Sequence, residues 1–261
     1  MTDAGDVAAL LASLPLWAFA SMMLVCRIGC ACMLLPGIGE MEVPMTIRAG
    51  FVVALTALLL PVLAPEMPPV PADTPRLAGM ILAEVVTGLW LGWLTRMILL
   101  ALPMAGQIIA STIGMTSVLQ PDAMLGAGAS ALSRMFGLAA PLLVLASGLH
   151  VYPMAALVGS YRLVHPGTFL PVADTVTAYV SALVDAFGLG LRLAAPFLMA
   201  GVLFHCGIGL IGRLVPQLQT YFAAMPGQIL GGLLLLGLLA SAMTSSWMSA
   251  AQDSFAGLPG L

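Results

Sequence analysis

Long runs of apolar residues, interrupted by proline, glycine and charge, dominate this chain of 261 residues. A helix needs about 20 such residues, at 1.5 Å each, to cross the hydrocarbon core of a bilayer. Six runs are long enough, or nearly so, to predict apolar helices: residues 15–35, 47–63, 76–102, 130–149, 176–204 and 228–248. The second run is short. Pro15 lies near the start of the first run, where proline is tolerated, and Pro196 is expected to kink the fifth.

The sequence between these runs predicts shorter elements. Residues 152–164 predict a partial helix followed by a turn at His165-Pro166-Gly167, and residues 207–215 predict a half-helix that Pro216 stops. Residues 64–75 contain five prolines and two acidic residues, which indicate an extended loop in water. The tail after residue 248 is expected to be small and weakly ordered.

Two segments are too irregular for a span that faces lipid. Residues 104–129 are rich in glycine and polar side chains, and a hairpin is expected around residues 216–220. Irregular backbone at membrane depth survives only where protein or a water-filled cavity surrounds it. Both segments are therefore candidates for a pathway lining or a subunit interface.

Composition narrows the class of protein. Hydrophobic residues make up 61% of the chain and charged residues 7%, with a mean hydropathy of +1.09. Soluble domains carry about 25% charged residues, and disordered chains have few apolar residues. We therefore expect an all-α membrane protein, or an equally apolar subunit of a larger assembly. The chain has no lysine and no basic stripe, which argues against nucleic-acid binding and against a lysine-dependent phosphate-binding loop.

Seven ionisable residues lie inside the apolar runs: Arg27, Glu84, Arg96, Arg134, Asp185, Arg192 and Arg213. Each would cost about 2.5–3.5 kcal/mol at the centre of a bilayer, so these helices do not all face lipid. Asp185 and Arg192 are seven residues apart, about 10 Å along a helix, and each is expected to meet another helix. Interhelical salt bridges are the favoured interpretation. A proton relay through Glu84 or Asp185 stays open.

No cofactor, metal or catalytic site is expected. The three histidines are far apart in the sequence, and the four cysteines match no zinc motif. No pairing of a nucleophile with a base is evident, so we expect a protein that is not an enzyme.

Small and flexible residues indicate close helix contacts. Gly88–Gly92 and Gly227–Gly231 each place two glycines four residues apart, which lets helices approach closely. The 18 methionines are interpreted first as core filling. Their alternative role is a deformable seal around a pore, for which Met104, Met115 and Met124 are the candidates.

Several motifs together resemble those of a known family. They are Arg27 followed by Pro36-Gly37-Ile38-Gly39, Glu84 to Gly92, Ala105-Gly106-Gln107-Ile108-Ile109 with Gly114-Met115, and Arg213-Leu214-Val215-Pro216-Gln217. Over nearly its whole length, the chain resembles the FliR family of flagellar export-gate proteins, also represented in virulence type III secretion systems as SctT. A single export-gate domain over residues 1–261 is expected.

The resemblance implies an irregular bundle of kinked helices and helical hairpins in a hetero-oligomeric gate. The implied partners are FliP, FliQ, FlhB and FlhA, and the implied cargo is unfolded flagellar protein. It also implies a multi-pass location in the bacterial inner membrane, in the flagellar basal body, and a plug within residues 104–129. The plug and gate candidates are Met104, Gly106, Gln107, Ile113, Gly114, Met115 and Met124. Pro216 and Gln217 belong to the family's motif hairpin.

Two other functions are compatible with this pattern. A virulence secretion subunit of the SctT type is the alternative within the family, and the flagellar role is favoured on resemblance. A secondary transporter is the alternative from another class, since transporters often have broken helices at matching positions of two halves. Here the two irregular segments are not obviously matched and no internal symmetry is visible.

Overall fold

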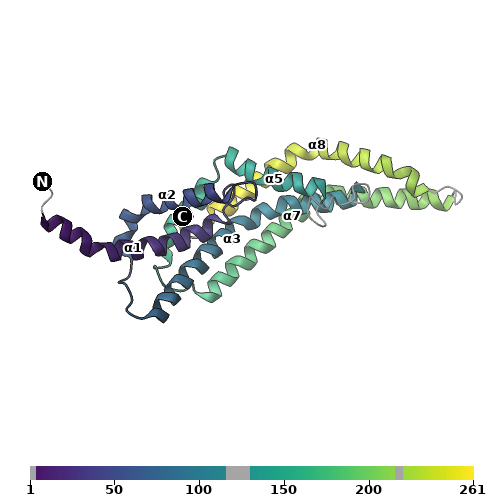
Figure 1. The fold of residues 1–261 in the computed structure, drawn as a ribbon. Helices are drawn as coiled ribbons and strands as arrows, with labels where there is room; N and C mark the ends of the chain where they lie inside the picture. Colours follow the sequence, from purple (N-terminus) through teal and green to yellow (C-terminus); the bar gives the residue numbers. More distant parts are fainter. Residues whose placement is uncertain (1–3, 116–129, 215–219) are drawn as a thin grey trace. The chain divides into compact units, whose positions relative to one another are not determined.

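The computed structural model describes residues 4–115, 130–214 and 220–261. Within this part of the chain all regular structure is helical, which confirms the all-α prediction (Figure 1). The helices are α1 (Ala4–Cys32), α2 (Met45–Leu63), the 3₁₀ turn η1 (Ala64–Glu66), α3 (Thr74–Thr112), α5 (Ala131–Ala146), α6 (Val151–Leu163), α7 (Val172–Leu214) and α8 (Thr220–Ala256).

Five of these helices, α1, α2, α3, α7 and α8, are long and apolar enough to cross a membrane. The pair α5 and α6 counts as a sixth span if the two helices are taken as one broken span. The predicted number of apolar segments is therefore confirmed. At 1.5 Å per residue, the 43 residues of α7 extend about 65 Å, roughly twice the hydrocarbon thickness. Part of α7 must therefore lie outside the lipid core.

Several predicted helix ends are wrong. α1 begins at Ala4, so Pro15 lies well inside it, and α7 continues through residues 207–214 as one helix rather than a separate half-helix. α3 continues through Pro103 to Thr112, which makes the first part of the segment 104–129 helical. The polar side chains that suggested a break are satisfied locally: the hydroxyls of Ser111 and Thr112 donate to the carbonyl of Ile108, at 2.8 and 2.7 Å. Such back-bonding lets these residues remain in a helix.

Most of the predicted loop at residues 64–75 is exposed, as expected, but its start is not extended, and the prediction of a weakly ordered tail is wrong. The loop at residues 64–75 contains η1, and its Ala64 and Met67 are buried. In the tail, α8 continues to Ala256, and Leu258 is buried beyond it. Apolar side chains from both segments are buried in the protein core. The proline content of the loop and the lack of charge in the tail therefore do not decide whether these side chains are exposed.

The described chain forms two compact units. Unit 1 takes residues from Met1–Arg96, Ser147–Val180 and Phe255–Leu261, and unit 2 takes residues from Met97–Ala146 and Ser181–Ser254. The helices α3, α7 and α8 therefore each contribute to both units.

Glycine sets the distance between α1 and α3 in unit 1. A Cβ on Gly88 would overlap the carbonyl of Arg27, and one on Gly92 would lie 3.0 Å from the carbonyl of Ala31. The first predicted glycine pair therefore does permit close helix contact. At the second pair, Gly227 and Gly231, no atom of the described residues lies within 4 Å of a Cβ built on either glycine.

We expect Gly88→Ala to destabilise unit 1 by about 1–3 kcal/mol, because its methyl group would push α3 away from the α1 backbone. Gly79→Ala is the matched control on the same helix, since a Cβ there meets nothing within 4 Å. That control should leave stability unchanged or raise it slightly. Thermal unfolding in detergent measures both, and equal melting temperatures for the two variants would contradict the close-packing argument.

Candidate functional site

Arg27 and Glu84 form a buried ion pair in unit 1. Arg27 comes from α1 and Glu84 from α3, and both side chains are fully buried. The contact is bidentate, with Arg27 Nε 2.7 Å from Glu84 Oε2 and Nη2 2.9 Å from Oε1. Two parallel charge-assisted bonds are the strongest arrangement available to these side chains.

Further hydrogen bonds complete this pair. Arg27 also donates to the hydroxyl of Ser160, at 3.3 Å, and to the carbonyl of Val164, at 3.1 Å. The backbone N–H of Gly167 donates to Glu84 Oε1, at 2.7 Å. The pair thus joins α1, α3, α6 and the turn after α6 at one point. Of the predicted charges, these two therefore meet across helices of the same chain.

An aromatic ring also contacts Arg27 of this ion pair. The guanidinium carbon of Arg27 lies 4.1 Å from the centre of the Tyr161 ring, and Tyr161 is itself buried. A cation held over an aromatic face gains electrostatic stabilisation when it is removed from water. Since both oxygens of Glu84 accept from fixed donors, the geometry favours a structural pair over a mobile proton carrier.

A second pair joins α3 to the loop between α1 and α2. Arg96 Nη2 is 3.2 Å from Glu40 Oε2, and both side chains are partly exposed. Arg48 donates to the backbone carbonyls of Glu40 and Val43. Arg96 is one of the seven predicted charges. The contacts of Glu40 and Arg48 were not predicted from the sequence, because neither residue lies in the middle of an apolar run.

The other four predicted charges have no hydrogen-bond or ion-pair partner among the residues that the structure describes. Arg134, Asp185, Arg192 and Arg213 are all exposed, and none forms a hydrogen bond or ion pair within residues 4–115, 130–214 and 220–261. Their expected salt bridges are therefore absent from this part of the chain.

The described part of the plug candidate is the C-terminal end of α3, in unit 2. Met104 packs against Gly190 of α7, and Gly106 lies close to Ser133 of α5. Gln107 accepts a hydrogen bond from the backbone N–H of Ser130, at 2.9 Å.

The next residues complete that end of α3. Ile113 is buried, Gly114 has a left-handed φ of +80°, and Met115 is half-buried. Met124, Pro216 and Gln217 lie outside the described residues. The side chains from Met104 to Met115 are therefore part of a packed helix end.

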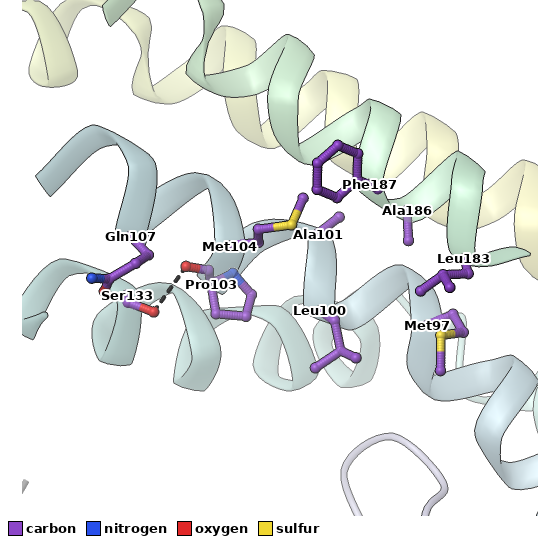
Figure 2. A pocket seen from close by; sticks show the side chains of 10 residues that line it. All are labelled: Met97, Leu100, Ala101, Pro103, Met104, Gln107, Ser133, Leu183, Ala186 and Phe187. Atoms are coloured by element: carbon purple, nitrogen blue, oxygen red, sulfur yellow. Dashed lines mark hydrogen bonds between the residues drawn. The ribbon is translucent and has the colours of Figure 1, made fainter. Parts of the chain in front are cut away.

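An apolar cavity of about 410 Å³ lies beside this helix end, in unit 2. In Figure 2, Met104 extends from α3 toward Phe187 of α7, and the Ser133 hydroxyl donates to the carbonyl of Pro103, at 2.8 Å. The lining residues are Met97, Leu100, Ala101, Pro103, Met104, Gln107, Ser133, Leu183, Ala186 and Phe187. Its walls are almost wholly aliphatic, aromatic or thioether, so they suit packing or sealing rather than acid–base chemistry.

Metal ligands do not gather in the described residues. No three His, Cys, Asp or Glu side chains there are arranged to hold a metal ion. His205 Nδ1 lies 2.7 Å from the Gly201 carbonyl within its own helix, and the four cysteines are unpaired thiols.

Two polar contacts were not predicted from the sequence. Gln228 of α8 donates to the carbonyl of Thr112, at 2.7 Å, and Trp247 donates to the carbonyl of Ile98, at 3.2 Å. Gln228 is a lone amide at the edge of an apolar run, which is the signal that could have identified it.

We expect Glu84→Leu to lower the free energy of unfolding by about 3–5 kcal/mol, because the Arg27 charge would remain buried without its partner. Arg27→Met should cost a similar amount for the same reason. The double variant should lose clearly less than the sum of the two. Denaturant unfolding in detergent measures this cycle.

Glu42→Leu is the control for this cycle, because Glu42 is exposed and has no ion pair within the described residues. It should leave stability nearly unchanged. Additive effects of the two buried substitutions would contradict the coupling of Arg27 with Glu84.

Comparison with known proteins identifies the family of the chain. A protein-family model, "Bacterial export proteins, family 1", matches residues 18–254. The flagellar biosynthetic protein FliR of Caulobacter vibrioides is 29% identical over 229 residues, which cover 88% of this chain and 91% of the relative.

Relatives of lower sequence coverage are also proteins named for flagellar biosynthesis or for protein translocation. FliR of Escherichia coli is 24% identical, with 78% of this chain and 77% of the relative covered. The Yop proteins translocation protein T of Yersinia pestis is 27% identical over 69% of each chain. The chain therefore belongs to the bacterial export proteins of family 1, the FliR and SctT family that its motifs predicted.

Proposed function

We propose that the chain is a subunit of the flagellar type III protein-export gate in the bacterial inner membrane. With FliP and FliQ it forms a closed channel through which unfolded flagellar proteins pass, and it contributes structure rather than catalysis. Its membership of a bacterial export family and its multiple apolar spans support this role. Residues 1–261 act as one export-gate domain in this proposal.

One observation carries the proposal: the rest of the chain covers almost none of the surface of two long apolar helices, α7 and α8. The most apolar 18 residues of α8 are only 6% buried and those of α7 only 17%, against 61% for α3. Both helices are longer than a bilayer core, so lipid alone cannot cover them. Exposed apolar surface of this extent marks an interface with other polypeptides.

The unpaired charges support the same conclusion. Asp185, Arg192 and Arg213 are exposed along α7 and have no partner in the described chain. A charge is costly against lipid but is tolerated beside an opposite charge, a backbone carbonyl or water. Neighbouring subunits around a conduit supply all three.

The relatives support a flagellar role. Relatives named as flagellar biosynthetic proteins FliR include the one from Caulobacter vibrioides, which is covered over 91% of its length. The Yop proteins translocation protein T supports the virulence alternative, at 69% coverage. Within this gate, Met104–Met115 and the cavity beside it form the described part of the proposed plug.

Recovery of partners tests the proposal directly. The tagged chain, extracted in mild detergent from its own cells, should co-purify with FliP, FliQ, FlhB and FlhA, identified by mass spectrometry. Recovery with the corresponding virulence secretion proteins would favour the alternative within the family. A stable particle that contains only this chain would refute the gate proposal and favour a transporter.

We expect Arg213→Leu to reduce recovery of the partner subunits at least about tenfold, because its counterpart on a neighbouring subunit would be left buried and unpaired. Arg76→Leu is the control, since Arg76 is exposed at the start of α3 beside a loop. It should leave recovery unchanged. Equal recovery for the two variants, at equal chain levels in the membrane, would remove Arg213 from the proposed interface.

A further inference from the structure

The C-terminal end of α3 is tied to α8 by one side chain. The last carbonyls of a helix have no partner within it. At this end, the carbonyl of Thr112 accepts a hydrogen bond from Gln228 Nε2, at 2.7 Å. Gln228 is only 8% exposed, so its amide is largely removed from bulk water. Beyond Thr112 the helix cannot continue, because Gly114 has a left-handed backbone with φ of +80°.

Two glycines form a socket for the same residues. Gly201 of α7 lies against the side chain of Thr112, and Gly232 of α8 lies against that of Ile113. A Cβ at Gly232 would be only 2.6 Å from Ile113 Cβ, so no larger residue fits there without a shift. The end of α3 therefore enters a gap between α7 and α8 that only glycine leaves open.

Space remains beside this socket. A cavity of about 290 Å³ is lined by Thr112, Ile113 and Gln228, together with residues of α7 and α8 that include Gly201 and Gly232. An unfilled space removes packing contacts from the atoms that border it. The cavity leaves room on one side of the helix end, and the Gln228 hydrogen bond opposes a shift in that direction.

We propose that Gln228 is a positioning residue that fixes the end of α3 between α7 and α8. Through this contact it keeps Met104–Met115 in the closed arrangement of the gate, a step that rests on the proposed function. The amide acts by donating one hydrogen bond to the Thr112 carbonyl and by filling the mouth of the socket.

A disulfide across the socket reports the position of α3. A Cβ at Gly201 would lie 3.8 Å from Thr112 Cβ, which is the usual separation in a disulfide. In a chain with its four native cysteines replaced by serine, Thr112→Cys with Gly201→Cys should cross-link rapidly in membranes under a mild oxidant. Adding Gln228→Leu should slow this cross-linking about tenfold, the factor expected for loss of one buried hydrogen bond.

Gln252→Leu is the matched control for this measurement. Gln252 lies on the same helix but is exposed, so its replacement should leave the cross-linking rate unchanged. If the Gln228→Leu variant does not accumulate, Gln228→Asn takes its place, because the shorter side chain keeps the amide but cannot reach Thr112. A rate within twofold of the parent chain in the tested variant would overturn the positioning role.

Ion leakage tests the link to the gate. Membranes that contain the assembled complex with Gln228→Leu should conduct ions above background. Oxidising the cysteine pair in that same variant should restore the seal, and a reductant should bring the leak back. A merely structural role would not give this reversible rescue. A tight seal before oxidation, at normal recovery of the partners, would overturn the link to the gate.

These outcomes separate two kinds of failure. If the unsubstituted chain is recovered without export-apparatus partners, the proposed function is wrong. The cross-linking rates still decide whether Gln228 positions α3, because they require only the folded chain in its membrane.

Discussion

The bidentate pair between Arg27 and Glu84 is the contact on which the architecture of unit 1 depends. Neither charge is tolerable alone in a buried, apolar setting, so α1 and α3 must meet where the two side chains can reach each other. The absence of a side chain on Gly88 brings the α1 backbone at Arg27 directly against α3. The remaining donors and acceptors, from α6 and the turn that follows it, leave few alternative arrangements for these segments. A polar contact thus specifies the packing of surfaces that are otherwise uniformly apolar.

Much of the fold could be predicted from the sequence, because hydrophobic runs identify helices whether lipid or protein covers them. The errors concern helix ends. Pro15 lies well inside α1 rather than near its start, and α3 continues past the predicted end at residue 102. The hydroxyls of Ser111 and Thr112 form hydrogen bonds within their own helix. Such local effects change the end of an element without changing the hydrophobic pattern on which the prediction rests.

The candidate site was less predictable, because its contacts join residues that are distant in the sequence. Arg27 and Glu84 are conspicuous as charges in apolar runs, but nothing in the sequence indicates that Ser160 and Gly167 complete their shell. Gln228 and Thr112 are 116 positions apart and meet only because glycines let α3 enter between α7 and α8. For Arg134, Asp185, Arg192 and Arg213 the described chain supplies no partner.

The discontinuous composition of unit 1 has a consequence for biosynthesis. Phe255 and Leu258, near the end of the chain, are buried in a unit that otherwise uses residues before 181. All residues of unit 2 are therefore synthesised before the last residues of unit 1 leave the ribosome. Until translation ends, the early helices lie in the membrane with part of their packing surface unoccupied. Quality-control proteases have access to them during this interval.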